Sequence, residues 1–273
     1  MRGGLRAAPR LTAYLAWTLA LLPLQLLALA LSRPLAARLP LLYHAGVLRI
    51  LGIRIERRGE PCGARPTLFV CNHGSYVDIE ALGAHIAGCF VAKREVASWP
   101  LFGLLARLQR SVFIDRRRSR AASQRDEIAA RLDAGDNIIL FPEGTSSDGA
   151  QVLPFKSALF AAADRSLAVQ PVSIAYTKLN GTPLTALMRP HVAWYGDMEL
   201  AGHLWNLVGL GSLTVALEFH PPVAARDFPS RKALADHCHE IVAAGLARAL
   251  HGGLTPRSAV LPSESVEISR VCD

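Results

Sequence analysis

An uncharged apolar run over residues 11–31 constrains the fold of this chain more than any other feature of its sequence. A helix rises about 1.5 Å per residue, so a run of this length can cross roughly 30 Å of hydrocarbon. Pro23 lies inside the run and is expected to kink the helix. Arg2, Arg6 and Arg10 precede the run, which also fits a secretory signal peptide. The run is longer than the apolar segment of a usual signal peptide, so a membrane anchor is the favoured interpretation.

A second apolar stretch begins at Pro34 and carries Arg38, His44 and Arg49, so it is expected to be amphipathic and interfacial. The two stretches predict a membrane-associated helical hairpin over residues 1–52, which either spans the bilayer or dips into one leaflet. The formal net charge of +8 favours anionic membrane lipids as partners. Nucleic acid is not expected as a partner, because aromatic residues make up only 7% and no basic stripe alternates with stacking rings.

Beyond residue 52, short β-rich runs alternate with helical patterns. This alternation predicts an α/β domain over residues 53–250, with a mixed, mostly parallel sheet flanked by helices. The expected strands are 53–57, 67–71, 89–93, 111–115, 137–141, 168–176, 191–195 and 213–219. The expected helices cover 78–86, 99–109, 119–135, 154–165 and 230–250. The Gly, Pro and Ser residues of 251–273 predict a flexible tail.

The strongest chemical signal is the sequence NHGSYVD, which follows an expected strand and holds His73 and Asp78 with four residues between them. Histidine suits proton transfer at neutral pH, and a carboxylate on its Nδ1–H would fix the tautomer and support the imidazolium. No protein nucleophile is needed if the hydroxyl of an acceptor substrate takes that position. For this spacing taken alone, the alternative is a chance pair in which Asp78 only caps a helix.

Three further motifs carry polar groups that are suited to bind a substrate. After the strand pattern NIILF, the turn residues Glu143, Gly144 and Thr145 can present a carboxylate, backbone N–H groups and a hydroxyl at one place. Arg116 follows the pattern SVFID and Lys156 is expected early in a helix, where each could bind an anion. Each motif also has a structural alternative. Residues 143–145 could form an ordinary turn, Arg116 could lie in a solvated basic loop, and Lys156 could be a surface lysine.

Taken in order, the pieces NHGSYVD, FIDR, FPEGT with the PFK that follows, and VQPVSIAY resemble the glycerolipid acyltransferase family, the lysophosphatidic acid acyltransferases and their relatives. The pieces span Asn72 to Tyr176. The resemblance implies transfer of a fatty-acyl group from acyl-CoA or acyl carrier protein to the free hydroxyl of a lysolipid, with no further cofactor and no metal. It also implies a membrane-dipping hairpin. Thioester donors are cytosolic, so the catalytic domain is expected on the cytoplasmic face, at the inner membrane in a bacterium.

The resemblance further implies roles for single residues. His73 would be the general base and Asp78 its orienting partner. The acceptor site would be shaped by Arg116, Glu143, Gly144 and Thr145.

One position departs from the family pattern, because phosphate-handling members usually read FPEGTRS and here Ser146 replaces the arginine. Losing a charge-assisted contact to phosphate should cost roughly 1.5–3 kcal/mol, unless Arg116, Lys156 or Lys93 replaces it. Two acceptors therefore stay open: 1-acyl-glycerol-3-phosphate, which would give phosphatidic acid, and the phosphate-free lyso-ornithine lipid. A membrane-anchored serine hydrolase is a weaker alternative, because the G-x-S-x-G elbow is absent from the sequence. The last alternative is a non-catalytic membrane scaffold, in which His73 and Asp78 are structural.

Overall fold

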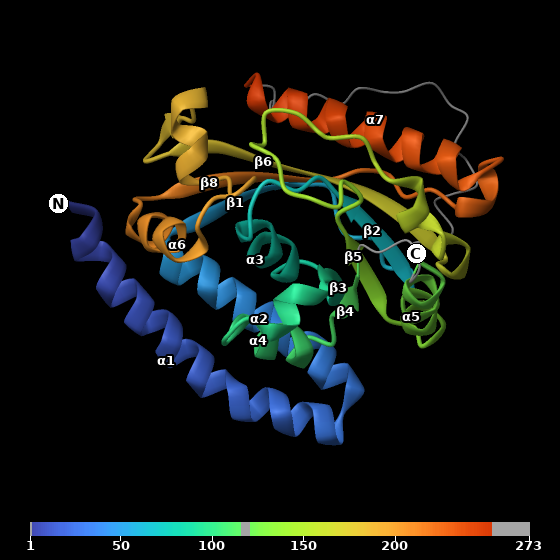
Figure 1. Ribbon diagram of the computed structural model, residues 1–273, viewed down its shortest axis with the longest axis horizontal. Coiled ribbons are helices and arrows are strands. Elements are labelled where there is room, and N and C mark those ends of the chain that lie inside the picture. Colours follow the sequence, from blue (N-terminus) through green and yellow to red (C-terminus); the bar gives the residue numbers. More distant parts are fainter. Residues whose placement is uncertain (1, 116–120, 253–273) are drawn as a thin grey trace.

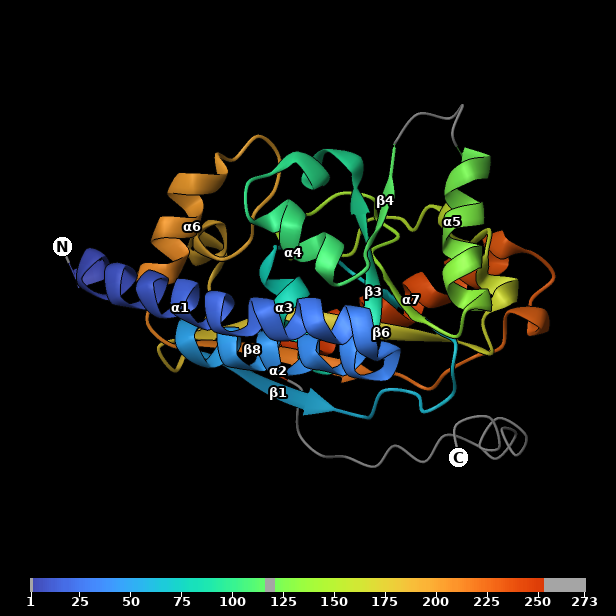
Figure 2. The same ribbon diagram turned by 90° about the horizontal axis from the view of Figure 1, so that it is seen from below.

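The computed structural model describes residues 2–115 and 121–252 of the 273-residue chain. Arg116 and all but the first two residues of the expected tail 251–273 lie outside the described residues. The described residues form a mixed sheet with helices packed on both of its faces (Figure 1, Figure 2).

Within the described residues the sheet has eight strands in the order β1-β8-β6-β2-β5-β3-β4, and the short β7 pairs with β6. The strands are β1 (Ile53–Arg58), β2 (Thr67–Cys71), β3 (Gly88–Lys93), β4 (Val112–Ile114), β5 (Asn137–Leu140), β6 (Ala168–Leu179), β7 (Thr182–Pro183) and β8 (Leu213–Phe219). All pairs are parallel except the two that β6 makes with β7 and β8. The expected α/β class with a mixed, mostly parallel sheet is therefore confirmed.

The α-helices of the described residues are α1 (Arg2–Leu31), α2 (Arg33–Leu51), α3 (Val77–Gly83), α4 (Phe102–Leu108), α5 (Ala121–Asp133), α6 (Leu200–Gly209) and α7 (Arg231–Leu250). Helix α7 begins after Ser230, whose side chain accepts the N–H of Ala233 and so caps the helix. Helix α7 packs along β6 on one face of the sheet, while α2 and α3 lie on the other (Figure 1). Each face has its own apolar core, so the sheet is buried on both sides.

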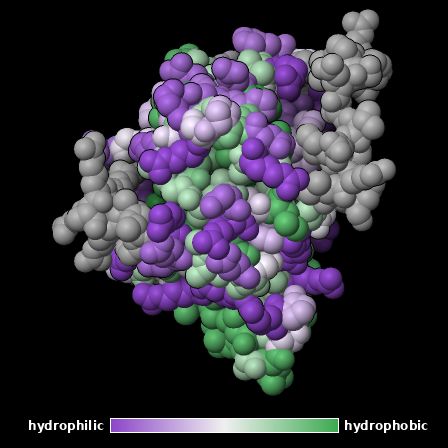
Figure 3. Space-filling model, turned by 90° about the vertical axis from the view of Figure 1, so that its right-hand side faces the viewer, coloured by the Kyte–Doolittle hydropathy of each residue, from purple (hydrophilic) through white to green (hydrophobic). Residues whose placement is uncertain are grey.

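Helices α1 and α2 form a hairpin joined by Ser32. The indole N–H of Trp17 donates to the carbonyl of Tyr43 at 3.0 Å, and a Cβ at Gly46 would lie 2.4 Å from the indole ring, so the two helices approach closely there. Among the described residues, Gly4–Leu31 is the one helical segment long and apolar enough to cross a membrane. The apolar side chains that the hairpin leaves exposed are Leu5, Leu15, Leu19, Leu24, Leu26, Leu27, Leu31, Leu35 and Leu42. Apolar surface gathers at the lower end of the molecule in Figure 3, where α1 meets α2.

The strand expected over residues 191–195 is wrong. His191 ends a 3₁₀ turn, and Trp194 donates its backbone N–H to the carbonyl of Gly74 instead of joining a neighbouring strand. The apolar residues of this segment are buried without forming a strand, since Val192 and Ala193 are adjacent and both fully buried.

The α-helix expected over residues 154–165 is also wrong, since the segment forms two 3₁₀ turns, Ser157–Phe160 and Ala163–Arg165. Lys156 donates its backbone N–H to the carbonyl of Pro142, which ties the start of the segment to the turn after β5. Lys156 therefore precedes a short 3₁₀ turn rather than standing in the first turn of an α-helix.

Candidate active site

Strand β2 ends at Cys71, and the turn that follows places His73 beside helix α3. The Nδ1 atom of His73 lies 2.8 Å from Oδ2 of Asp78, so the two residues of the motif form a hydrogen-bonded pair. Asp78 is fully buried, and the same oxygen accepts the backbone N–H groups of Gly74 and Ser75 at 2.8 and 3.0 Å. One carboxylate therefore fixes both the turn and the imidazole.

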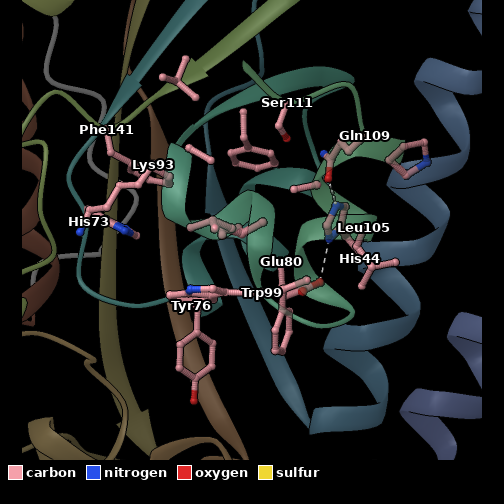
Figure 4. A pocket seen from close by; sticks show the side chains of 18 of the residues that line it. His44, His73, Tyr76, Glu80, Lys93, Trp99, Leu105, Gln109, Ser111 and Phe141 are labelled. Carbon is pink, nitrogen blue, oxygen red and sulfur yellow. Dashed lines mark hydrogen bonds and ion pairs between the residues drawn. The ribbon is translucent and has the colours of Figure 1, made fainter. Parts of the chain in front are cut away.

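The imidazole of His73 lies between the core and a cavity. Its ring stacks on Phe141, with the ring centres 4.1 Å apart and the planes inclined by 20°. Because Nδ1 is bonded to Asp78, the ring presents Nε2 to the cavity that His73 lines (Figure 4). A histidine held in this way can take a proton at Nε2 while its Nδ1–H stays on the carboxylate.

Strand β6 supports this turn through two side-chain contacts. The amide of Asn72 donates to the carbonyl of Ile174 and accepts its N–H, both at 2.9 Å. Tyr176, two residues further along β6, donates its hydroxyl to Oδ1 of Asp78. Both residues belong to the matched motifs, but sequence reasoning gave neither a role at the site. Their contacts form only when β2 and β6 pair side by side.

Glu143 is buried behind the site. Its Oε1 accepts the backbone N–H of His73 at 2.6 Å, and its Oε2 accepts that of Leu153 at 2.9 Å. Burial, the largest effect, raises the pKa of Glu143 to about 7, although the two backbone N–H groups act in the opposite direction. Glu143 is predicted to help shape the acceptor site, and it is not among the residues that line the cavity. Its carboxylate instead ties the turns at residues 73 and 153 to the turn after β5.

The turn after β5 forms one wall of the cavity through Gly144, Thr145 and Ser146. Gly144 has a φ of +67°, and a Cβ there would lie 2.6 Å from Nζ of Lys156. Glycine is therefore required both for the turn and for the approach of the ammonium group. Gly144, Thr145 and Lys156 all line the cavity.

Charged side chains of both signs line the cavity. Lys93, at the end of β3, and Lys156 supply ammonium groups, while Glu95 and Asp115 supply carboxylates. Strands β3 and β4 pair in parallel, which places Asp115 one residue beyond the partner of Lys93. Arg116, the other cation expected here, lies outside the described residues. Such a wall can bind an anionic or a zwitterionic head group.

The cavity has a volume of about 650 Å³ and is lined mainly by apolar side chains. In Figure 4, His73 lies at one end and His44 at the other, with Trp99 and Leu105 between them. The hairpin closes the far end with side chains from both of its helices: Tyr14, Thr18, Leu21, Leu22, Gln25, Leu39, Pro40, Tyr43 and His44. The shape and lining suit a long aliphatic chain whose reactive end lies at His73.

A serine–histidine pair lies on the opposite face of the sheet, under α7. Oγ of Ser173 is 2.7 Å from Nε2 of His220 and donates to the carbonyl of Val242 at 3.0 Å. Burial, the largest effect, lowers the pKa of His220 to about 4. Both side chains are buried and neither lines the cavity, so the pair gives no support to a serine hydrolase.

Comparisons with known proteins agree with this geometry. The sequence profile of the acyltransferase family matches residues 54–175. The chain is 43% identical over 267 residues to a lyso-ornithine lipid O-acyltransferase of Brucella abortus, an alignment that covers 94% of this chain and 100% of that protein. It is 34% identical over 206 residues to a 1-acyl-sn-glycerol-3-phosphate acyltransferase of Neisseria meningitidis, covering 74% of this chain and 78% of that protein. The crystal structure of a 1-acyl-sn-glycerophosphate acyltransferase from Thermotoga maritima has the same fold, with a TM-score of 0.68 at 23% identity over 91% of this chain and 97% of that chain.

A histidine–aspartate pair at one end of a long apolar cavity defines an enzyme that acts on a lipid chain. The chain belongs to the acyltransferase family, and within it to the lysolipid acyltransferases that its motifs predicted. The roles assigned to its individual site residues stay predictions.

Proposed function

We propose that the chain is a lyso-ornithine lipid O-acyltransferase, which moves a fatty-acyl group from a thioester to the free hydroxyl of a lyso-ornithine lipid. The observation that carries this proposal is Ser146, which lies in the cavity wall where phosphate-handling members of the family have arginine. The 43% identity to a protein named for this activity supports it.

The charges of the wall support the same acceptor. The head group of a lyso-ornithine lipid is zwitterionic, with one carboxylate, one ammonium group and no phosphate. Lys93 and Lys156 can receive the carboxylate, and Glu95 and Asp115 can receive the ammonium group. With serine at residue 146, no guanidinium from this position repels the ammonium group.

His73 acts as the general base of the transfer. Its Nε2 takes the proton of the acceptor hydroxyl while Asp78 stabilises the imidazolium through Nδ1–H. The acceptor oxygen attacks the carbonyl carbon of the thioester, a C–O bond forms and the C–S bond breaks. The departing thiolate takes the proton from Nε2, so His73 returns to its neutral form. The donor is acyl-CoA or acyl carrier protein, and these steps need no further cofactor.

The enzyme acts at a membrane, with its catalytic domain on the cytoplasmic face. The exposed leucines of the hairpin support contact with lipid, and the net charge of +8 supports an anionic surface. The cytoplasmic face follows from the thioester donor, which is made in the cytosol.

Lysophosphatidic acid is the second candidate acceptor. Two lysines in the wall can bind a phosphate, and the chain is 34% identical to the Neisseria enzyme named for the glycerophosphate reaction. An assay therefore has to offer both acceptors.

The test uses purified, detergent-solubilised protein with a labelled acyl thioester, given as acyl-CoA and as acyl carrier protein in separate reactions. Lyso-ornithine lipid and lysophosphatidic acid are offered in parallel. We expect acylation of lyso-ornithine lipid, and we expect His73→Ala to abolish it while vesicle binding persists. Acylation of lysophosphatidic acid alone would overturn the proposed acceptor. Full activity of His73→Ala would overturn the assignment of the base.

A further inference from the structure

Four hydrogen bonds converge on Asp78. Its Oδ2 accepts Nδ1–H of His73 and two backbone N–H groups, and its Oδ1 accepts the hydroxyl of Tyr176. No part of the Asp78 side chain is exposed to solvent. Each of these donors fixes the position of the buried carboxylate, so each contributes to the arrangement in which Asp78 can orient His73.

Tyr176 reaches Asp78 because β6 is longer than β2. Cys71, the last residue of β2, pairs with Val172, and β6 continues to Leu179. Tyr176 therefore lies on the part of β6 that runs past the end of β2, beside the turn that carries His73. A Cβ at Gly74 would lie 3.3 Å from Cε2 of Tyr176, so the tyrosine ring packs directly against this turn.

The hydroxyl of Tyr176 is a permanent donor. Burial, the largest effect, and the charge of the neighbouring Asp78 raise the pKa of Tyr176 well above its usual value. The phenol therefore keeps its proton and gives it to Oδ1 in a hydrogen bond. With Oδ1 occupied, Oδ2 is the oxygen that remains for Nδ1–H of His73.

We propose that Tyr176 is a positioning residue of the acyl transfer, which holds the Asp78 carboxylate with Oδ2 aligned on His73. This inference rests on the proposed role of His73 as general base. Tyr176 does not line the cavity, so it acts on the reaction through Asp78 and not through the substrate. The ring of Tyr176 packs on the turn that carries His73, and its hydroxyl adds a positioning role.

Tyr176→Phe removes the hydroxyl and keeps the ring that packs on Gly74. We expect kcat to fall about 10-fold or more, as for the loss of one hydrogen bond to a charged group, with KM within about 2-fold of the wild-type value. In an Asp78→Asn background the same substitution is expected to cause no further loss, because its effect passes through the carboxylate. The matched control is Tyr195→Phe, at a half-buried tyrosine outside the cavity, which should leave kcat unchanged.

The kinetics are measured on the full chain in detergent, and a thermal melt of each variant accompanies them. An unchanged kcat in Tyr176→Phe would overturn the proposal. An equal loss in the wild-type and Asp78→Asn backgrounds would also overturn it, because it would place the effect in packing. Failure of the proposed function is seen separately, as absence of acyl transfer by the wild-type protein.

Discussion

Asp78 and Glu143 are two buried carboxylates of the same site, and their hydrogen bonds give them different tasks. Asp78 accepts the side chains of His73 and Tyr176, so its loss should be seen in turnover. Glu143 accepts the backbone N–H groups of His73 and Leu153, so its loss should be seen first in the stability of the turns.

Glu143 should make the free energy of unfolding depend on pH. Its pKa is about 7 in the folded chain, against an ordinary value of 4.5, so between these values the folded state holds a proton that the unfolded state releases. The contribution of Glu143 to the free energy of unfolding is therefore fully present below pH 4.5. It falls by up to about 3 kcal/mol as the pH rises to 7. Glutamine at residue 143 cannot titrate. The free energy of unfolding of the wild type should therefore exceed that of Glu143→Gln by less and less as the pH rises. Thermal melts across this pH range measure the difference.

The control for this experiment is Glu60→Gln, at a carboxylate that is 72% exposed. The difference in free energy of unfolding between Glu60→Gln and the wild type should stay constant across this pH range. A constant difference for Glu143→Gln as well would contradict the prediction.

Ser146→Arg should shift the acceptor preference toward phosphate. The new guanidinium would lie in the cavity wall near Lys156 and could bind a phosphate, a contact of roughly 1.5–3 kcal/mol, or about 10-fold or more in kcat/KM for lysophosphatidic acid. The same charge should lower kcat/KM for lyso-ornithine lipid, because it repels the ammonium group. Ser146→Ala adds no charge and serves as the control. If Ser146→Arg leaves the ratio of the two kcat/KM values unchanged, residue 146 does not select the acceptor.

His73 and Asp78 could be predicted from the sequence because their spacing is local, and a strand followed by a helix brings them together. Tyr176 could not, since it lies 98 residues after Asp78 and meets it only through the pairing of β2 with β6. Glu143 was identified as a site residue, but the direction of its side chain depends on the turn at Leu153, which no local pattern specifies.

Helices α2, α3 and α4 meet at His44. Its Nδ1 lies 2.7 Å from Oε2 of Glu80 on α3, and its Nε2 lies 2.9 Å from Oε1 of Gln109 after α4. A Cβ at Gly83 would lie 2.4 Å from the imidazole, so α3 approaches the ring closely. Since Glu80 follows Asp78 by two residues on the same helix, His44 connects the N-terminal hairpin to the helix that carries Asp78.

His44→Ala should destabilise this junction. It leaves the half-buried Glu80 and Gln109 without their partner and enlarges the cavity that His44 lines, which should cost about 3 kcal/mol and lower the melting temperature by several degrees. Acyl transfer should fall too, because α3 loses a contact that fixes it. Lys232→Ala, which breaks a surface ion pair of α7 with side chains 78% and 56% exposed, should leave both measurements unchanged. Equal melting temperatures for the two variants would show that the His44 contacts do not hold the junction.

Most elements could be predicted from apolar periodicity, because strands buried on both faces and helices with one buried face leave strong patterns. The segments at 154–165 and 191–195 have similar patterns but different structures. Each is held by single backbone bonds to a distant turn, Lys156 to Pro142 and Trp194 to Gly74. Such contacts depend on the finished fold, which explains why periodicity failed there.

At the scale of the molecule, the cavity is built jointly by the hairpin and the α/β domain. Helices α1 and α2 line its far end, and the strand ends and α3 line the end near His73. Arg10 of α1 donates to the carbonyls of Val208 and Leu210 at 3.1 and 2.6 Å, which also ties the hairpin to the end of α6. The sequence predicted the hairpin as an anchor, but its part in closing the cavity follows only from the folded arrangement.

This arrangement predicts that the leucine surface of the hairpin controls access to lipid substrates. Leu24 and Leu27 of α1 are 49% and 55% exposed, and replacing both with aspartate should weaken binding to anionic vesicles by about 10-fold or more. Activity on vesicle-embedded lysolipid should fall with binding, while activity on a short-chain acceptor in solution should persist, because the site itself is unchanged. Leu187→Asp, at a leucine that is 89% exposed outside the hairpin, is the matched control and should bind vesicles normally. Parallel loss of activity on both acceptors would mean that these leucines support the cavity rather than the contact with the membrane.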